Sequence, residues 1–129
     1  MNWEIKYLLQ EGVVTVKISG TLTDIDENQK MVAEALAVAK EHGTTKCLLD
    51  DRDLTLDMKI MDIYDVPELL SNLGVPRNYR VALVVAESAR HDEGFTFYET
   101  RAFNMGYHHR LFTDIQTALD WLTDQGDEG

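Results

Sequence analysis

The chain is short of cysteine, of basic residues and of long apolar stretches. Cys47 is the only cysteine among 129 residues, so no disulfide can form within the chain, as is usual in a reducing cytoplasm. The longest apolar run, residues 81–86, is far too short to span a bilayer, and the first residues carry charges where a signal peptide would be apolar. We therefore expect a cytoplasmic protein without a transmembrane segment.

Positive charge is also scarce. Twelve basic residues against 23 acidic ones leave a net charge of −11. Such a surface repels nucleic-acid phosphates and anionic lipid headgroups, so neither is expected as a partner. A protein with a basic face or a metal ion would suit it better, although acidity by itself can simply maintain solubility.

Alternating and helical patterns follow one another in the first part of the chain. Residues 3–9 and 13–18 alternate apolar with polar side chains, which predicts an opening β-hairpin. Asp24 and Glu27 form a capping box in front of apolar residues at helical spacing, and Gly43 is a suitable terminator for that helix.

Strands and helices alternate in the middle of the chain. Residues 46–50 and 79–86 are apolar runs typical of buried strands. Residues 57–74 have a helical pattern that contains Pro67, which would break a helix at its centre. A fresh capping box beginning at Asp65 would place this proline in a first turn, so we expect a kink or restart there.

The last part of the chain completes the pattern. Residues 95–105 have an apolar stripe at helical spacing, residues 108–112 form a short strand, and Thr113 caps a final helix. The order ββαβαβαβα predicts a single α/β domain over residues 1–124, with an N-terminal β-hairpin, a mixed sheet of about five strands and about four helices. Residues 125–129 are expected to form a flexible acidic tail.

The segment CLLDDRDLTLD, residues 47–57, ends a buried strand in clustered carboxylates. Such a cluster is compatible with a metal loop, a phosphatase site, a partner surface or a solvated turn. Alternate ligand positions of a calcium-binding EF-hand loop are matched by Asp51, Asp53, Thr55, Asp57 and Asp62. Leu56 stands where that loop needs a glycine, and a strand leads in where a helix is required, so calcium is not expected.

The same segment resembles the D-x-D-x-T signature of haloacid dehalogenase-type phosphatases. This resemblance implies that Asp51 is the nucleophile and Asp53 the general acid/base beside Mg²⁺, with Ser88 binding the phosphate. The rest of that pattern is missing, because no lysine follows Lys59 and the signature lies on the third strand where the family has it on the first. We therefore expect a protein that is not an enzyme.

The histidines and methionines indicate no other site. His108 and His109 are adjacent in a strand, so they point to opposite faces and cannot share a metal. No serine–histidine–acid set, glycine-rich phosphate loop or zinc spacing occurs. Met58, Met61 and Met105 are expected to fill the core. Neither a metal nor a cofactor is predicted.

Four segments resemble, in their order and spacing, the STAS domain superfamily and in particular its SpoIIAA-like branch. They are VKISGTLTD, CLLDDRDLTLD, RVALVVAES and HHRLFTDIQTALDWL, and the resemblance covers residues 3–122. It implies the SpoIIAA-like fold. It also implies a non-enzymatic role in binding a protein partner, as in bacterial anti-sigma-factor antagonists.

Those antagonists are regulated by phosphorylation of a serine at the start of the helix that follows the third strand. Here Lys59 occupies that place, Met58 precedes it, and Thr55 lies several residues early. The usual phosphorylation switch is therefore not expected. If relatives indicate the partner surface, it consists of Asp51, Arg52, Asp53, Thr55, Asp57, Met58 and Lys59. Alternatively these residues only solubilise a turn, and Asp57 caps the next helix.

Some SpoIIAA-like proteins also resemble the CRAL-TRIO lipid-transfer fold, which implies an apolar small-molecule carrier as an alternative. The residues that would line its pocket are Ile60, Met61, Ile63, Tyr64 and Val66. A helix that packs on the core needs the same residues, so both interpretations stay open. The edge of the hairpin is free to pair with another chain, but nothing in the sequence specifies an oligomeric state.

Overall fold

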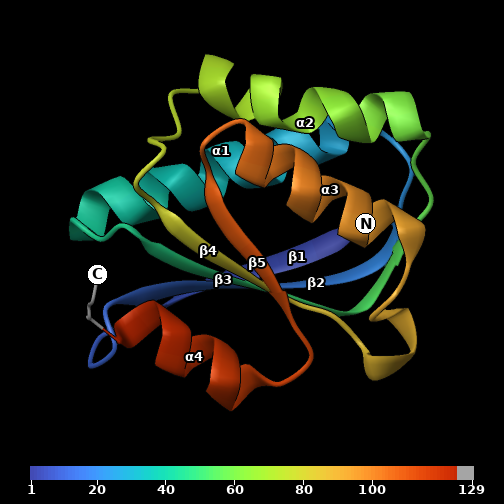
Figure 1. Ribbon diagram of the computed structural model, residues 1–129. Coiled ribbons are helices and arrows are strands. Elements are labelled where there is room, and N and C mark those ends of the chain that lie inside the picture. Colours follow the sequence, from blue (N-terminus) through green and yellow to red (C-terminus); the bar gives the residue numbers. More distant parts are fainter. Residues whose placement is uncertain (125–129) are drawn as a thin grey trace.

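The computed structural model describes residues 1–124, which form a five-stranded sheet with helices on both faces (Figure 1). In chain order the elements are β1 (Asn2–Leu8), β2 (Val13–Leu22), α1 (Ile25–His42), β3 (Lys46–Leu56), α2 (Ile60–Asn72), β4 (Arg80–Val84), η1 (Glu87–Ala89), α3 (Glu93–Asn104), β5 (His108–Phe112) and α4 (Ile115–Thr123). The predicted α/β class, opening hairpin, mixed sheet and element order are confirmed. The predicted tail, residues 125–129, lies outside the described residues.

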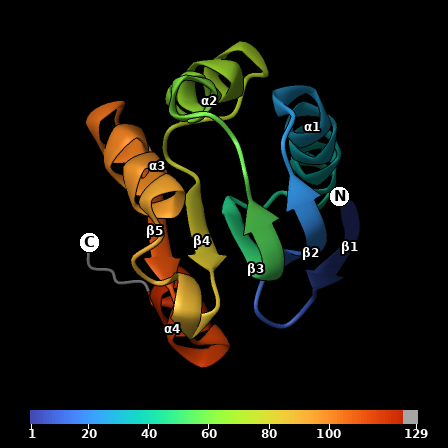
Figure 2. The same ribbon diagram turned by 90° about the vertical axis from the view of Figure 1, so that its right-hand side faces the viewer.

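The strands lie side by side in chain order, β1-β2-β3-β4-β5. β1 and β2 pair antiparallel, and all later neighbours pair parallel. Successive crossovers therefore step across the sheet in one direction. Because these crossovers all have the same handedness, α1, α2 and α3 lie on one face of the sheet, and α4 covers the other (Figures 1 and 2).

β4 separates two hydrophobic cores. Val81 and Leu83 belong to the core beneath α1, α2 and α3, whereas Ala82 and Val84 belong to the core beneath α4. Because β4 is an interior strand covered on both faces, it is a continuous apolar run and does not alternate.

The predicted helix caps are partly right. Asp24 caps α1 by accepting a hydrogen bond from the backbone N–H of Asp26, and Gly43 ends the helix with φ +66°, where glycine avoids the steric cost of a side chain. Glu27 does not complete the capping box, because its carboxylate pairs with the N-terminal ammonium. The prediction that Thr113 caps α4 is wrong, because Asp114 does so.

The predicted restart of α2 is also wrong. The helix is continuous from Ile60 to Asn72 with Pro67 inside it, and its N-cap is Lys59, without a side-chain cap from Asp57. Pro67 leaves one helical carbonyl without its usual donor, but its ring is fully buried. Burial of the proline against the core offsets the lost hydrogen bond, an interaction that local sequence patterns do not reveal.

Candidate ligand-binding cavity

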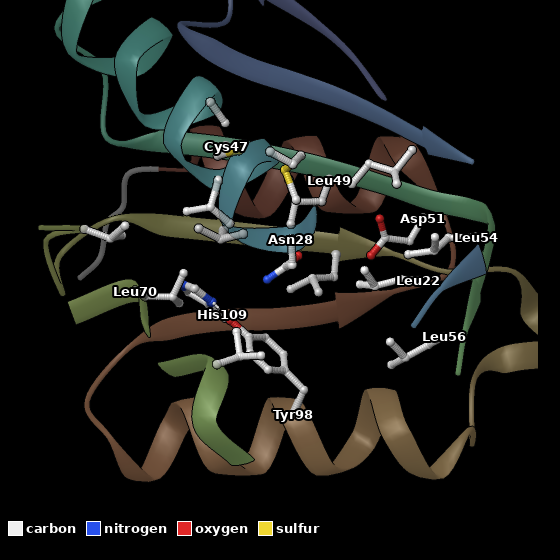
Figure 3. Close-up of a pocket in the computed structure, with 18 of the residues that line it drawn as sticks. Leu22, Asn28, Cys47, Leu49, Asp51, Leu54, Leu56, Leu70, Tyr98 and His109 are labelled. Atoms are coloured by element: carbon white, nitrogen blue, oxygen red, sulfur yellow. Dashed lines mark hydrogen bonds between the residues drawn. The ribbon is translucent and has the colours of Figure 1, made fainter. Parts of the chain in front are cut away.

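A cavity of about 130 Å³ lies between the sheet and the three helices α1, α2 and α3 (Figure 3). Apolar side chains from each of these layers line it, among them Met31, Ala35, Leu49, Ile63, Leu70 and Phe95. Polar side chains also reach its wall, among them Asn28 of α1, Asp51 of β3, Tyr98 of α3 and His109 of β5. The site is therefore an apolar chamber with a few separated polar groups, which is the usual composition of a small-molecule site.

Asp51 reaches the cavity because β3 is longer than the sequence predicts. The strand was expected to end at Asp50 but continues to Leu56, paired with β2 along its length. In this pairing Lys17 lies opposite Asp50 and Ser19 lies opposite Asp53. Ser19 follows Lys17 by two residues in β2, whereas Asp53 follows Asp50 by three residues in β3. The one extra residue in β3 is a β-bulge.

The bulge turns apolar side chains on both sides of it toward the same chamber. The residues of β3 that line the cavity are Cys47, Leu49, Asp51, Leu54 and Leu56. Strict alternation from Asp51 would have sent Leu54 and Leu56 to the opposite face of the sheet. Of the charged residues in this segment, Asp51 therefore lies within an otherwise apolar part of the cavity wall.

Asp50 and Asp51 have opposite environments. Asp50 faces away from the cavity and accepts hydrogen bonds from Nε and Nη2 of Arg52 at 2.8 and 2.9 Å, while Nζ of Lys17 lies 3.5 Å from it. The hydrogen bond from Arg52 holds the pKa of Asp50 below its usual value. Asp51 is only 4% exposed and makes no side-chain hydrogen bond or ion pair within residues 1–124.

Burial, assisted by the negative charge of Asp50, raises the pKa of Asp51 to about 7. The carboxyl group is therefore divided between its neutral and ionised forms near neutral pH. Its Oδ1 is a buried atom without a partner in the described part of the chain. An uncompensated carboxylate in an apolar wall is costly to the fold, and such groups occur preferentially at functional sites.

His109 and two tyrosines form a second polar group in this region. The hydroxyl of Tyr98 is hydrogen-bonded to Nδ1 of His109 at 2.6 Å, and the ring of Tyr107 packs against the same imidazole at 5.3 Å between centroids. Burial lowers the pKa of His109 to about 4, so its imidazole is neutral at neutral pH. Its Nε2 and the hydroxyl of Tyr107 lack partners within residues 1–124.

The structure does not bring the phosphatase-like residues together. Asp51 faces the cavity, whereas Asp53 is exposed and pairs with Lys17 at 3.2 Å beside Asp50, on the opposite face of the sheet. Ser88 is exposed in the short turn η1. Asp51 and Asp53, which the phosphatase resemblance makes nucleophile and acid/base, thus face opposite sides of β3.

The predicted partner surface is only partly a surface. The prediction that Asp51 belongs to this surface is wrong, because Asp51 is buried, as is its neighbour Asp50. The exposed members of the set are Arg52, Asp53, Thr55, Asp57 and Lys59, and Met58 is half-buried on the cavity wall. Their role in partner binding stays a prediction.

Two of the five residues predicted to line a pocket do so. Ile63 and Val66 face the cavity. Ile60, Met61 and Tyr64 were assigned wrongly, because they lie on the outer side of α2 with 39%, 68% and 43% of their surface exposed. A continuous helix has one inward stripe, and these three residues lie outside it.

Most residues of the cavity wall were not predicted from the sequence. Tyr98 lies within the predicted apolar stripe of residues 95–105 and was given no separate role, as was His109. The place of Asp51 at the end of the predicted strand concealed its inward orientation. The available signal was the alternation Cys47, Leu49, Asp51, which continues the inward face by one more residue.

Within residues 1–124 no group of three or more histidine, cysteine, aspartate or glutamate side chains is placed to hold a metal ion. In the same part of the chain no helix is long and apolar enough to cross a membrane.

Comparison with known proteins is informative about the fold. No protein-family profile and no curated protein matches the chain. A solved structure matches 94% of this chain and 92% of its own, with a TM-score of 0.56 and 22% sequence identity. It is an uncharacterized protein from the DUF3478 family with a SpoIIAA-like fold, from Shewanella loihica PV-4. The fold of this chain is SpoIIAA-like. The STAS resemblance of the sequence is thereby confirmed at the level of fold, and function depends on the site itself.

Proposed function

We propose that this SpoIIAA-like protein binds a small apolar molecule in the cavity beneath α1, α2 and α3. The observation that carries the proposal is a chamber of about 130 Å³ with apolar walls inside the main core. Protein interiors are normally packed with few voids larger than a water molecule, and an apolar cavity of about 150 Å³ stays dry and takes up benzene. A single aromatic ring is therefore the scale of ligand that this chamber fits.

The proposal is tested by filling the chamber from one helix. Ala35 lies on the inner side of α1 and lines the cavity, whereas Ala37 of the same helix is exposed. Benzene should raise the thermal midpoint of the wild type and of Ala37→Leu, but not that of Ala35→Leu. Contacts from benzene to the methyl groups of Leu49 and Leu70, measured by NMR on the wild type, locate the ligand without any substitution. Absence of both effects would contradict the proposal.

A second candidate function, binding of a protein partner, is favoured by an exposed apolar patch. Ile60, Met61 and Tyr64 lie on the first two turns of α2, directly after Lys59, and are 39%, 68% and 43% exposed. Arg101 links α3 to α2 by donating from Nε to the backbone carbonyl of Tyr64 at 3.1 Å. Apolar side chains gathered at the surface are typical of interaction sites.

Variants at two exposed apolar positions test the partner candidate. Met61→Glu places a charge in the patch, and Leu9→Glu places one in the β1–β2 turn, where Leu9 is 81% exposed. Proteins captured from the native cell by the wild type should be lost with Met61→Glu and retained with Leu9→Glu. Equal capture by both variants argues against this surface.

We also propose that the protein is not an enzyme. Supporting this, Asp51 and Asp53 face opposite sides of β3 and cannot act on one phosphate. Turnover of generic phosphate esters with Mg²⁺ that disappears in Asp51→Asn would overturn the proposal.

A further inference from the structure

The carboxylate of Asp51 is the feature of the cavity that the apolar ligand proposal leaves unexplained. Its side chain is directed into the chamber, is 4% exposed and has no partner within residues 1–124 (Figure 3). Among these residues neither a lysine nor an arginine lines the cavity. An apolar ligand without a polar group would leave this buried carboxylate as it is.

The charged groups closest in sequence are engaged elsewhere. Arg52 and Lys17 pair with Asp50 on the opposite face of the sheet, and Lys17 also pairs with Asp53. On the cavity side, the imidazole of His109 is neutral and bonded to Tyr98, so it supplies no positive charge. Met1 also lines the cavity, but its N-terminal ammonium pairs with Glu27 at 3.4 Å. Within residues 1–124 the carboxylate of Asp51 therefore has acceptor capacity and no ion-pair partner.

We infer that the ligand is a small hydrophobic amine, whose ammonium group pairs with Asp51 while its apolar body fills the chamber. This inference rests on the proposed function and specifies its ligand. A carboxylic acid or a phosphate would be repelled by Asp51, and the ammonium of Met1 at the cavity is already paired with Glu27. The net charge of −11 further favours the approach of cations over anions.

Asp51 has lost its hydration before any ligand binds. Burying a charged pair usually costs free energy because both groups leave water. Here the fold has already removed Asp51 from water, so on binding only the ammonium group loses its hydration. Hydrogen bonds to charged groups are worth enough to improve affinity by about tenfold to a hundredfold over a ligand that lacks the charge.

Three probes of one size separate charge from shape. Benzylamine, benzyl alcohol and benzoate share a benzene ring and differ in the charge of the substituent. Their affinities for the full chain would be measured by calorimetry at about pH 8, where Asp51 is ionised and benzylamine is still cationic. The same series would be run on Asp51→Asn and on Asp53→Asn, a control that removes an equal charge on the opposite face of the sheet.

We expect the wild type and Asp53→Asn to bind benzylamine about tenfold to a hundredfold more tightly than benzyl alcohol, and Asp51→Asn to lose this preference. Benzylamine should also lower the pKa of Asp51 followed by carboxyl NMR in the wild type, a readout that needs no variant. Equal affinities for amine and alcohol, or tightest binding of benzoate, would overturn the amine inference and leave an apolar site in place. Failure of all three probes and of benzene would overturn the proposed function as well.

Discussion

The hydroxyl of Tyr98 lies 2.6 Å from Nδ1 of His109, and this hydrogen bond joins α3 to β5 at the wall of the cavity. The pair is enclosed by apolar side chains, and burial raises the pKa of Tyr98 and lowers that of His109. Both groups therefore stay neutral near pH 7 and hold one another in a fixed orientation.

Tyr98→Phe should destabilise the protein by about 1–3 kcal/mol, because the substitution leaves the buried imidazole without a partner. The matched control is Tyr64→Phe, whose hydroxyl makes no hydrogen bond within residues 1–124 and which should cost less than about 0.5 kcal/mol. Urea denaturation at neutral pH measures both. Equal effects of the two substitutions would show that the hydrogen bond contributes nothing to stability.

Asp51→Asn should stabilise the protein above neutral pH. The carboxyl has a pKa of about 7 in the folded protein against 3.8 as a free group, so the folded state binds more protons between these values. The Asp51 carboxyl therefore contributes to the stability of the wild type at low pH, and this contribution is lost as the pH rises from about 4 to about 7. A difference of about three pKa units corresponds to a gain in the variant of up to about 4 kcal/mol.

The measurement for Asp51 is the difference in unfolding free energy between variant and wild type at several pH values. His109 also titrates in this range, but its contribution is common to both proteins and cancels in the difference. The difference should grow between about pH 4 and pH 7 and then level off. Asp53→Asn should show no such growth, because Asp53 is exposed and its ion pair with Lys17 is worth little. A flat profile for Asp51→Asn would contradict its buried, unpaired state.

Gly43→Ala should cost about 1 kcal/mol, because the residue ends α1 with φ +66° and alanine is strained there. No atom lies within 4 Å of the position of an added Cβ, so the cost is conformational and not a clash. Gly43→Asn should be milder, since asparagine tolerates this backbone region better. Thermal denaturation that ranks asparagine below alanine would argue against the left-handed cap.

Asp114→Ala should destabilise α4, whereas Thr113→Ala should have little effect. The carboxylate of Asp114 accepts hydrogen bonds from the backbone N–H and the hydroxyl of Thr117 at 2.8 and 2.9 Å. These bonds lower the pKa of Asp114, so its contribution is present at neutral pH and lost as pH falls through the folded pKa. The difference between wild type and Asp114→Ala should therefore shrink in acid. The reverse ranking at neutral pH would identify Thr113 as the cap.

The order of the elements was predictable because each one carries its own periodicity. The hairpin shows alternation, α1 shows a helical stripe between Asp24 and Gly43, and β4 shows the continuous apolar run of a strand covered on both faces. These patterns report which side of an element is buried. Each pattern lies within one helix or strand and does not depend on which elements pack against it.

What only the tertiary structure decided is that Leu54 and Leu56 lie on the same cavity wall as Asp51. β3 continues to Leu56 because β2 supplies hydrogen-bonding partners for it, and the bulge opposite Lys17 and Ser19 sets which side chains face inward. Both depend on pairing with a strand about thirty residues away, so no local pattern contains them. By itself the sequence determined a SpoIIAA-like order of strands and helices. The pairing of β3 with β2 then placed the acidic segment after Asp50 in a strand that forms part of the cavity wall.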